Sequence, residues 1–242
     1  MTAVSRDPSY DNRYCLLLDT AAARSAAAVY DMQAMQIVSC VDSLIGKGHA
    51  ELLLDQVAEA LAGAGIVMRD LSRIGVTVGP GSFTGLRVGI SAARGLALAL
   101  DIEAVGVGTL EALAFPWLRQ GGPVLAVQDA RRGEVFAALY DAAGGVMAPA
   151  AALSPPAAAS LVPQDGRLLH ITGSGAELVG PLIAGGFKQL HDYEGFPQVA
   201  AIGAIAATRQ PGEPVRPLYL RGADAKPQAP VAGISRTGLP SA

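Results

Sequence analysis

Residues 73–100 read RIGVTVGPGSFTGLRVGISAARGLALAL, which is an apolar run, a glycine-rich turn and a helical pattern in direct succession. The apolar run Arg73 to Gly79 predicts a strand, and the spacing from Thr84 to Leu100 predicts a helix. Glycine permits backbone angles that a side chain would block, so the turn between them can be tight. Ser82 or Thr84 can cap the helix by accepting from its free amides. The stretch therefore predicts a strand–turn–helix unit of an α/β protein.

The same turn is a possible anion site, because a glycine-rich turn at a helix N-terminus presents free amides. This makes Gly81, Ser82 and Thr84 candidates for binding a cofactor. The Gly-Lys-Ser/Thr ending of a Walker A loop is missing, so no lysine would reach a phosphate. A tight turn without a ligand is the simpler interpretation of the same residues.

Small residues recur along one face of the predicted helix 84–100. Glycine inside a helix costs about 0.5–1 kcal/mol relative to alanine, so a closely packed neighbour is expected on this face. That neighbour lies either within the chain or in a partner. A preceding helix over residues 49–62 carries its own apolar stripe. Together the two helices supply the candidates for a partner interface, which are His49, Leu53, Val57, Gly85, Arg87, Gly89 and Ala93.

The order of the predicted elements repeats along the chain. The first half predicts strands at 14–19, 25–30, 36–41, 73–79 and 104–107, with helices at 49–62, 84–100 and 110–119. The second half predicts strands at 124–129, 134–140 and 168–172, an extended connector with a further strand over 147–163, and helices at 173–184 and 199–208. Both halves open with an apolar strand that ends in aspartate. This order predicts an internal duplication and the two-lobed α/β fold shared by actin, sugar kinases and Hsp70, an RNase H-like fold with mixed sheets.

The expected organisation has four parts. Residues 1–13 are a disordered lead, 14–108 an N-terminal actin-like lobe used for dimerisation, and 109–222 a C-terminal lobe. The last helix is expected to pack back on the first lobe. Residues 223–242, rich in Pro, Ala, Gly and Ser, are expected to be a flexible tail.

Composition limits the possible functions. The formal net charge of −3 argues against a freestanding nucleic-acid binder, which needs clustered Lys and Arg. The charged fraction of 16% is low, which fits either a buried protein interface or an alanine-rich composition typical of a GC-rich genome. Cys15 and Cys40 are expected to be buried thiols rather than a disulfide. No secretory signal is apparent. The apolar stretch 88–100 contains Arg94 and is short for a membrane span, so a cytoplasmic protein is expected.

Five motifs, in order along the chain, give a specific resemblance. They are residues 16–20 (LLLDT), His49 with Leu52–Leu54, residues 74–97, residues 129–136 (DARRGEVF) and residues 217–221 (PLYLR). The segment 74–97 resembles the hallmark of the TsaB (YeaZ) family, and the other four are similar to its remaining motifs. The resemblance covers residues 14 to 222.

The resemblance implies an actin-like fold and a role as the dimerisation subunit in tRNA threonylcarbamoyladenosine synthesis. That family, formerly grouped with M22-like peptidases, pairs with the catalytic paralogue TsaD, and the ATPase TsaE joins them. It forms a homodimer when alone and meets tRNA only through the complex. ATP and a metal would then belong to the partner subunits, and this chain would need no cofactor of its own.

The resemblance also implies that this chain is not the catalyst. The catalytic paralogue binds a metal through His-x-x-x-His after the strand that follows the glycine-rich helix. Here residues 105–111 read VGVGTLE, where only Glu111 could bind a metal. The three histidines, His49, His170 and His191, make no local metal pair. The first strand's Asp19 is followed by Thr-Ala-Ala-Ala rather than by glycine, so Asp19 is expected to have a structural role.

The alternative is an independent hydrolase that uses the turn 79–85, either a nucleotide phosphohydrolase or a peptidase. A peptidase would need Ser82 as nucleophile with a positioned base, for which His49 and Asp19 are the available partners. Asp129, Arg131 and Glu134 are expected to form a charge network beside a tight turn, or alternatively to contact a nucleotide or partner.

Overall fold

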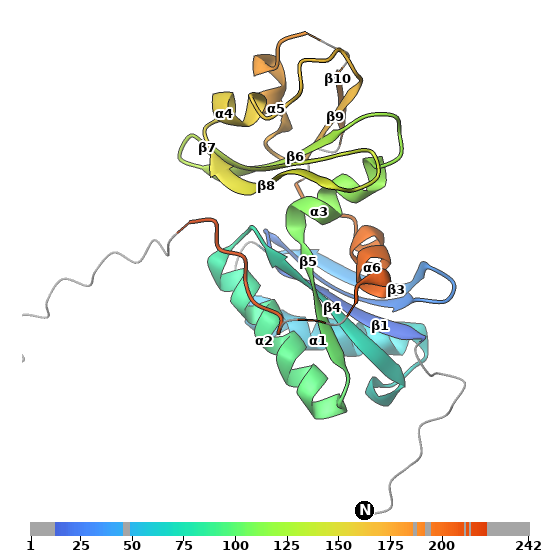
Figure 1. The fold of residues 1–242 in the computed structure, drawn as a ribbon. Helices are drawn as coiled ribbons and strands as arrows, with labels where there is room; N and C mark the ends of the chain where they lie inside the picture. Colours follow the sequence, from blue (N-terminus) through green and yellow to red (C-terminus); the bar gives the residue numbers. More distant parts are fainter. Residues whose placement is uncertain are drawn as a thin grey trace, which may run out of the picture.

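Two five-stranded sheets form the protein, as seen in a computed structural model (Figure 1). The structure describes residues 13–45, 49–185, 188–191, 195–210, 212 and 214–221. The first sheet has the order β3-β2-β1-β4-β5. Its strands and helices are β1 (Tyr14–Asp19), β2 (Arg24–Asp31), β3 (Gln36–Leu44), α1 (His49–Ala64), β4 (Leu71–Gly79), α2 (Phe83–Leu100) and β5 (Glu103–Gly108).

The second sheet has the order β10-β9-β6-β7-β8. Its elements are β6 (Val124–Arg131), β7 (Glu134–Tyr140), β8 (Val146–Leu153), α4 (Pro155–Ala159), β9 (Leu169–Thr172), α5 (Ala176–Val179) and β10 (Lys188–His191). Helix α3 (Thr109–Ala114) links the two halves, and α6 (Val199–Thr208) follows β10. Short 3-10 turns lie at Met68–Asp70, Phe115–Trp117 and Gly180–Leu182.

The second sheet repeats the topology of the first. In each half the first three strands form an antiparallel meander, and the fourth and fifth strands add in parallel beside the first. Each half also has its helices at the same points in the strand order. The predicted fold class, a duplicated two-lobed α/β fold with mixed sheets, is confirmed.

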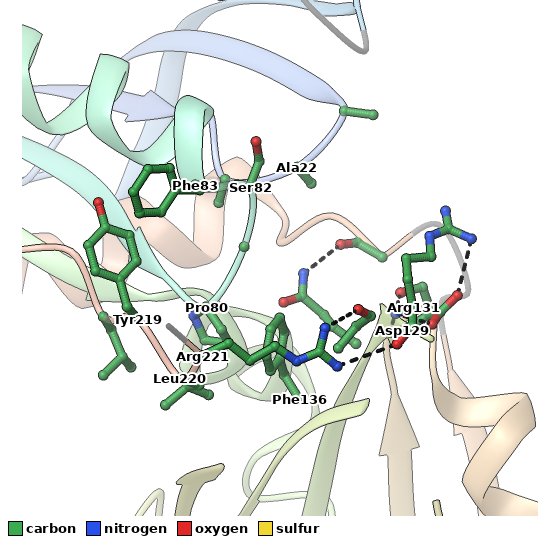
Figure 2. A pocket seen from close by; sticks show the side chains of 18 of the residues that line it. Ala22, Pro80, Ser82, Phe83, Asp129, Arg131, Phe136, Tyr219, Leu220 and Arg221 are labelled. Carbon is green, nitrogen blue, oxygen red and sulfur yellow. Dashed lines mark hydrogen bonds and ion pairs between the residues drawn. The ribbon is translucent and has the colours of Figure 1, made fainter. Parts of the chain in front are cut away.

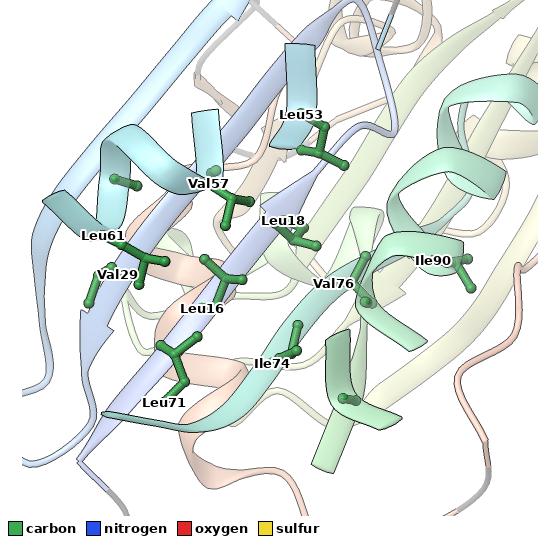
Figure 3. Close-up of a cluster of buried hydrophobic side chains, with 14 of the residues drawn as sticks. Leu16, Leu18, Val29, Leu53, Val57, Leu61, Leu71, Ile74, Val76 and Ile90 are labelled. Atoms are coloured by element: carbon green, nitrogen blue, oxygen red, sulfur yellow. The ribbon is translucent and has the colours of Figure 1, made fainter. Parts of the chain in front are cut away.

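Helices cover both faces of the first sheet (Figure 1). Successive side chains of a strand point to opposite faces. Leu16 and Leu18 of β1 pack with α1 and α2, where Leu53 and Val57 complete one core (Figure 3). Residues from the opposite face of the sheet pack against α6 in a second core, whose members include Cys15, Leu17, Ala28, Ile202 and Ile205.

Helix α3 belongs by sequence to the first half but packs on the second sheet. Leu110 and Leu113 lie in one buried cluster with Val124 and Ala126 of β6. Helix α6, which follows the second half, packs against β1, β4 and β5 of the first. The chain therefore crosses between the lobes twice, and each lobe is completed by a helix that follows the other lobe's last strand.

The sequence prediction differs from the structure in several places. Strand β10 was not predicted, since Lys-Gln-Leu-His carries no strong apolar pattern. The connector 147–163 contains a full strand and the short helix α4. The helices predicted at 110–119 and 173–184 each break into a short α-helix and a 3-10 turn. The predicted lead up to residue 12, the whole predicted tail 223–242 and the side chain of His49 lie outside the described residues.

The two cysteines are both free thiols, but they differ in environment. Cys15 is fully buried, and burial raises the pKa of its thiol to about 12. Cys40 lies on the outer strand β3 and is exposed, so the prediction that it is buried is wrong. An edge strand packs on one side only, which leaves every second side chain in solvent.

Helix α2 is, by length and composition alone, apolar enough to cross a membrane. It is the one such helix among the described residues. Its inner face is nevertheless buried against the first sheet, through Leu86, Ile90 and Ala97. A core helix of this length in a globular protein can be equally apolar. Packing on the first sheet therefore accounts for the apolar composition of α2.

A buried histidine pair joins β9 and β10. Nδ1 of His170 and Nε2 of His191 lie 2.9 Å apart, and the His191 ring stacks on Trp117 with ring centres 3.6 Å apart. Both histidines are buried. Burial, and secondarily the charge of His170, lowers the pKa of His191 below its ordinary value.

This lowered pKa predicts that the fold loses stability in mild acid. The folded state favours neutral His191, so the stabilising contribution is full above the ordinary histidine pKa of about 6.5 and is lost as the pH falls below it. We expect the melting temperature to fall over that range. In His191→Phe, which keeps a ring against Trp117, the fall should be smaller. An identical pH profile in that variant would contradict the assignment.

Candidate functional site

A cleft of about 870 Å³ separates the two lobes (Figure 2). Its lining comes from three sources: the turns after β1 and β4 in the first lobe, the end of β6 with β7 in the second, and the C-terminal residues 218–221. We call residues 214–221 the strap. Clefts of a few hundred to a thousand cubic ångströms between domains are the usual location of ligand sites.

The glycine-rich turn lines this cleft and packs directly on the turn after β1. The amide of Ser82 donates to the carbonyl oxygen of Ala21 over 2.6 Å. A methyl group placed on Gly81 would lie 2.1 Å from that same oxygen. The hydroxyl of Thr20 donates to the carbonyl of Gly85 over 2.7 Å. The turn after β1 and the glycine-rich turn are therefore in direct contact. They leave no space between them for the phosphate groups of a nucleotide.

Both carboxylate oxygens of Asp19 have partners within the chain. Oδ1 accepts from the hydroxyl of Thr77 over 2.8 Å and from the amide of Ala21 over 3.2 Å. Oδ2 forms an ion pair with Arg24 over 3.1 Å. These contacts support the structural role expected for Asp19.

Helix α2 begins at Phe83, one residue before the predicted Thr84, and Ser82, one of the two predicted candidates, is its cap. The Ser82 hydroxyl accepts from the amide of Gly85 over 3.2 Å, while Thr84 is exposed and caps nothing. Among the cofactor candidates, Gly81 and Ser82 line the cleft and Thr84 does not. Because a serine used as a helix cap is already engaged, this geometry favours the structural interpretation of the turn.

The strap lines the cleft and contacts both lobes. Val215 is buried in the core of the first lobe, and the Leu218 amide donates to the carbonyl of Val78 over 2.7 Å. The ring of Tyr219 packs on Phe83 with centres 4.8 Å apart, and its hydroxyl accepts from Nε of Arg87 over 3.0 Å. Farther along, the strap reaches the second lobe.

Arg221 of the strap contacts the hairpin between β6 and β7, where the predicted charge network lies. Its guanidinium pairs with Glu134 and donates to the carbonyl of Ala130 over 2.8 Å. Asp129 pairs with Arg131 over 3.2 Å and accepts from the Arg131 amide over 2.7 Å. The prediction grouped Asp129, Arg131 and Glu134 correctly beside a tight turn, but Glu134 pairs with the strap instead of with its hairpin neighbours.

Most of the residues predicted for a partner interface face inward instead. Leu53 and Val57 are fully buried on the inner face of α1. Gly85, Gly89 and Ala93 are also buried, since a methyl group on Gly89 would lie 2.4 Å from the Thr20 hydroxyl. The prediction of a close neighbour on this face is correct, but the neighbour is the chain's own first sheet.

A peptidase or metal centre finds no support among the described residues. Asp19 is engaged with Arg24 and Thr77, and His170 and His191 bond to each other in the second lobe. Glu111, the one residue of 105–111 that could bind a metal, pairs with Arg209. No group of three or more metal-binding side chains lies within the part of the chain that the structure describes.

Sequence reasoning missed Arg24 and Phe196. Arg24 pairs with Asp19, also donates to the carbonyl of Pro197, and lies over the Phe196 ring with its guanidinium carbon 5.4 Å from the ring centre. An arginine that opens a strand carries no pattern that would reveal a partner 173 positions away. Residues 217–221 did stand out as a motif, although nothing in their spacing predicted contact with both lobes.

Known proteins match this chain over half of its length or more. A family model described as "TsaD: tRNA N6-adenosine threonylcarbamoyltransferase" matches residues 41–172. An uncharacterized protein of Mycobacterium tuberculosis H37Rv is 34% identical over 214 residues, which cover 88% of this chain and 94% of the relative. The Escherichia coli tRNA threonylcarbamoyladenosine biosynthesis protein TsaB is 36% identical over 127 residues, 52% of this chain and 54% of the relative.

A solved structure decides the assignment. YeaZ from Pseudomonas aeruginosa matches with a TM-score of 0.72 at 27% identity, covering 86% of this chain and 100% of that structure. The chain belongs to the TsaB/YeaZ family. The resemblance read from residues 74–97 is thereby confirmed. In this member of the TsaB/YeaZ family, those residues form β4, its tight turn and the inner face of α2.

Proposed function

We propose that this protein is a non-catalytic scaffold subunit in the biosynthesis of tRNA threonylcarbamoyladenosine. Its partners would be a TsaD-like catalytic paralogue and a TsaE-like ATPase in the cytoplasm, with a homodimer forming when the chain is alone. Names of its relatives place them in this pathway. The observation that carries the scaffold role is the exposed outer face of α1 and α2.

This outer face is apolar and built from small residues. Both helices cover the same face of the first sheet (Figure 1), and they contact each other. On α1 and α2, exposed apolar or small residues recur at helical spacing. We call them the outer stripe, which consists of Leu54, Ala58, Ala62, Ser91, Gly95 and Leu98. Leu98 is 85% exposed and Leu54 59% exposed, which is costly for leucine in water.

Charges beside the outer stripe are segregated by helix. The exposed charges of α1 are acidic, at Asp55 and Glu59, whereas those of α2 are basic, at Arg87 and Arg94. A two-fold pairing that sets α1 of one subunit against α2 of the other brings opposite charges together. A paralogue with the same lobe could offer the same helices, so one face would serve both the homodimer and the heterodimer.

The outer stripe gives a direct test. Leu98→Glu and Leu54→Glu should each weaken self-association and binding of the TsaD-like paralogue at least tenfold, because a charge would be buried at the centre of the contact. Light scattering after size exclusion measures the first, and titration calorimetry the second. Leu178→Glu, at a residue 47% exposed on α5 of the other lobe, is the matched control.

Reconstitution of tRNA threonylcarbamoylation then tests the role itself. Omitting this chain should abolish modification by the paralogue and ATPase, and Leu98→Glu should reproduce most of that loss while Leu178→Glu does not. If both glutamate variants associated and supported modification like the wild type, the outer stripe would not be the interface. If modification proceeded without the chain, the scaffold role would fail.

A further inference from the structure

The strap is held at several points on the first lobe but by one side chain on the second. On the first lobe, Val215 lies in the core and the Leu218 amide donates to the Val78 carbonyl over 2.7 Å. A methyl group on Gly79 would lie 2.8 Å from the Leu218 carbonyl oxygen, so the strap is in close contact with the end of β4. Within the described chain, every hydrogen bond from the strap to the second lobe comes from Arg221.

The contact of Arg221 with the second lobe is polar and partly exposed to water, so it can break without unfolding either lobe. The guanidinium pairs with Glu134 and donates to the carbonyl oxygens of Ala130 over 2.8 Å and Arg131 over 3.4 Å. It also lies over the Phe136 ring, 5.4 Å from its centre (Figure 2). The side chains of Arg221 and Glu134 are 25% and 46% exposed. Nε of Arg221 is buried without an acceptor among the described residues, which makes the docked state less stable.

The two chain crossings between the lobes lie apart from this contact. Helices α3 and α6 carry the chain from one lobe to the other, and they contact each other. In Figure 1 they lie at the centre and right of the molecule, whereas the strap runs along α2 on the left. The lobes are therefore joined by the crossings on one side and by the strap on the other. This is the arrangement of a hinge with a closure that can open.

Arg87 connects the strap to the exposed surface of α2. Its Nε donates to the Tyr219 hydroxyl over 3.0 Å, and its guanidinium carbon lies 3.8 Å from the centre of the Phe83 ring. Tyr219 packs on the same ring and stands two positions before Arg221. Arg87 is exposed, and its two terminal nitrogen atoms have no acceptor among the described residues. The docked strap therefore holds Arg87 in one orientation, with donors left for the carboxylate of a partner.

We propose that Arg221 is a releasable latch between the lobes, and that a partner bound to α2 through Arg87 favours the latched state. The latch follows from the contacts of the strap alone, whereas the coupling rests on the proposed function, which places α2 at an interface. Docking of the strap orders Arg87 in advance, so a partner's carboxylate binds it at a lower entropic cost. Because linkage between two sites is reciprocal, the partner in turn stabilises the latched state.

Distances between two spin labels test the latch on the full-length chain. Cys40 is exposed on β3 and carries the label of the first lobe. Glu177→Cys, at an exposed position of α5, carries the label of the second. Cys15 is fully buried and should not react. The labelled chain is diluted with unlabelled chain, so that only distances within one chain are measured.

Removing either partner of the latch should have the same effect on this distance. Arg221→Ala should broaden the distribution of distances and extend it to longer values, and Glu134→Gln should do so from the other side of the ion pair. Arg167→Ala, which breaks a different ion pair of the second lobe, is the matched control and should leave the distribution unchanged. Circular dichroism and the melting temperature check that each variant is folded.

The coupling is tested by titration calorimetry with the TsaD-like paralogue. Arg221→Ala should weaken its binding about fivefold, the lower end of the usual coupling between two sites, although Arg221 lies outside the outer stripe. Tyr219→Phe keeps the ring on Phe83 but removes the acceptor for Arg87. It should weaken binding similarly while the label distance of the free chain stays that of the wild type. Saturating paralogue should narrow the wild-type distance distribution.

Two results would overturn the two parts of the proposal. An unchanged distance distribution in both Arg221→Ala and Glu134→Gln, with both chains folded, would mean that there is no latch. A broadened distribution in Arg221→Ala with wild-type affinity for the paralogue would mean that the latch is not coupled to the interface. Failure of the proposed function looks different. If Leu98→Glu and Leu54→Glu bound the paralogue like the wild type, the interface and the coupling would both fall, and the label distances would still decide the latch.

Discussion

Replacing Gly85 by alanine is expected to lower the free energy of unfolding by about 3 kcal/mol. A methyl group at this position would lie 2.0 Å from the carbonyl oxygen of Thr20, far inside contact distance. The obstacle is backbone in the turn after β1, so no flexible side chain can move aside. That turn is also held by the Thr20 hydroxyl and by Ser82. Either α2 must shift outward or these hydrogen bonds must break.

The control for this experiment lies on the same helix. A methyl group on Gly95 meets no atom within 4 Å, so Gly95→Ala adds only helix propensity. It should stabilise the fold by about 0.5–1 kcal/mol. Urea unfolding followed by far-ultraviolet circular dichroism gives both values. If the two substitutions changed the free energy of unfolding equally, helix propensity rather than contact with Thr20 would determine the effect of each.

Gly85 is closely packed and Gly95 is not, and this difference shows how much the sequence could predict about α2. Helical spacing shows which residues share a face, and glycine at Gly85 and Gly89 correctly indicates a close neighbour on that face. It does not show whether the neighbour is the chain's own sheet or another subunit. A bulky substitution such as Gly89→Leu is therefore a poor test of association between subunits. The Cβ atom of the new side chain would already collide with the Thr20 hydroxyl inside the same chain.

The fold itself was predictable from local patterns. Two apolar strands ending in Asp19 and Asp129, each followed by short strands and helices, were enough to indicate the duplication. The features that could not be predicted depend on contacts between residues that are far apart in the sequence. Arg221 meets Glu134 across 87 positions, and Arg24 meets Pro197 across 173. The aromatic lining of the cleft was hidden for the same reason, because its rings lie far apart along the chain.

The second large effect is expected at Arg24, whose replacement by alanine should cost about 3–4 kcal/mol of unfolding free energy. The ion pair of Arg24 with Asp19 is almost fully enclosed, with side chains 13% and 2% exposed. Removing the arginine leaves a buried carboxylate without its counter-charge, and it also removes the donor to the Pro197 carbonyl. Breaking a buried pair from one side is costly because desolvation of the remaining charge is no longer offset.

An exposed ion pair provides the comparison. Arg167 and Asp165 lie 2.6 Å apart, but their side chains are 61% and 41% exposed, so Arg167→Ala should leave the free energy of unfolding nearly unchanged. Adding Asp19→Asn to Arg24→Ala should recover part of the loss, because the unpaired charge is then gone. Recovery cannot be complete, since the contact of Arg24 with Pro197 and Phe196 stays lost.

The size of that remaining deficit measures how much Arg24 holds the lobes together. Phe196 and Pro197 lie in the connection from the second sheet to α6, whereas Arg24 opens β2 of the first. If the double variant regained full stability, Arg24 would serve only to neutralise Asp19. A residual loss accompanied by a larger radius of gyration in X-ray scattering would instead identify Arg24 as a link that holds the two lobes together.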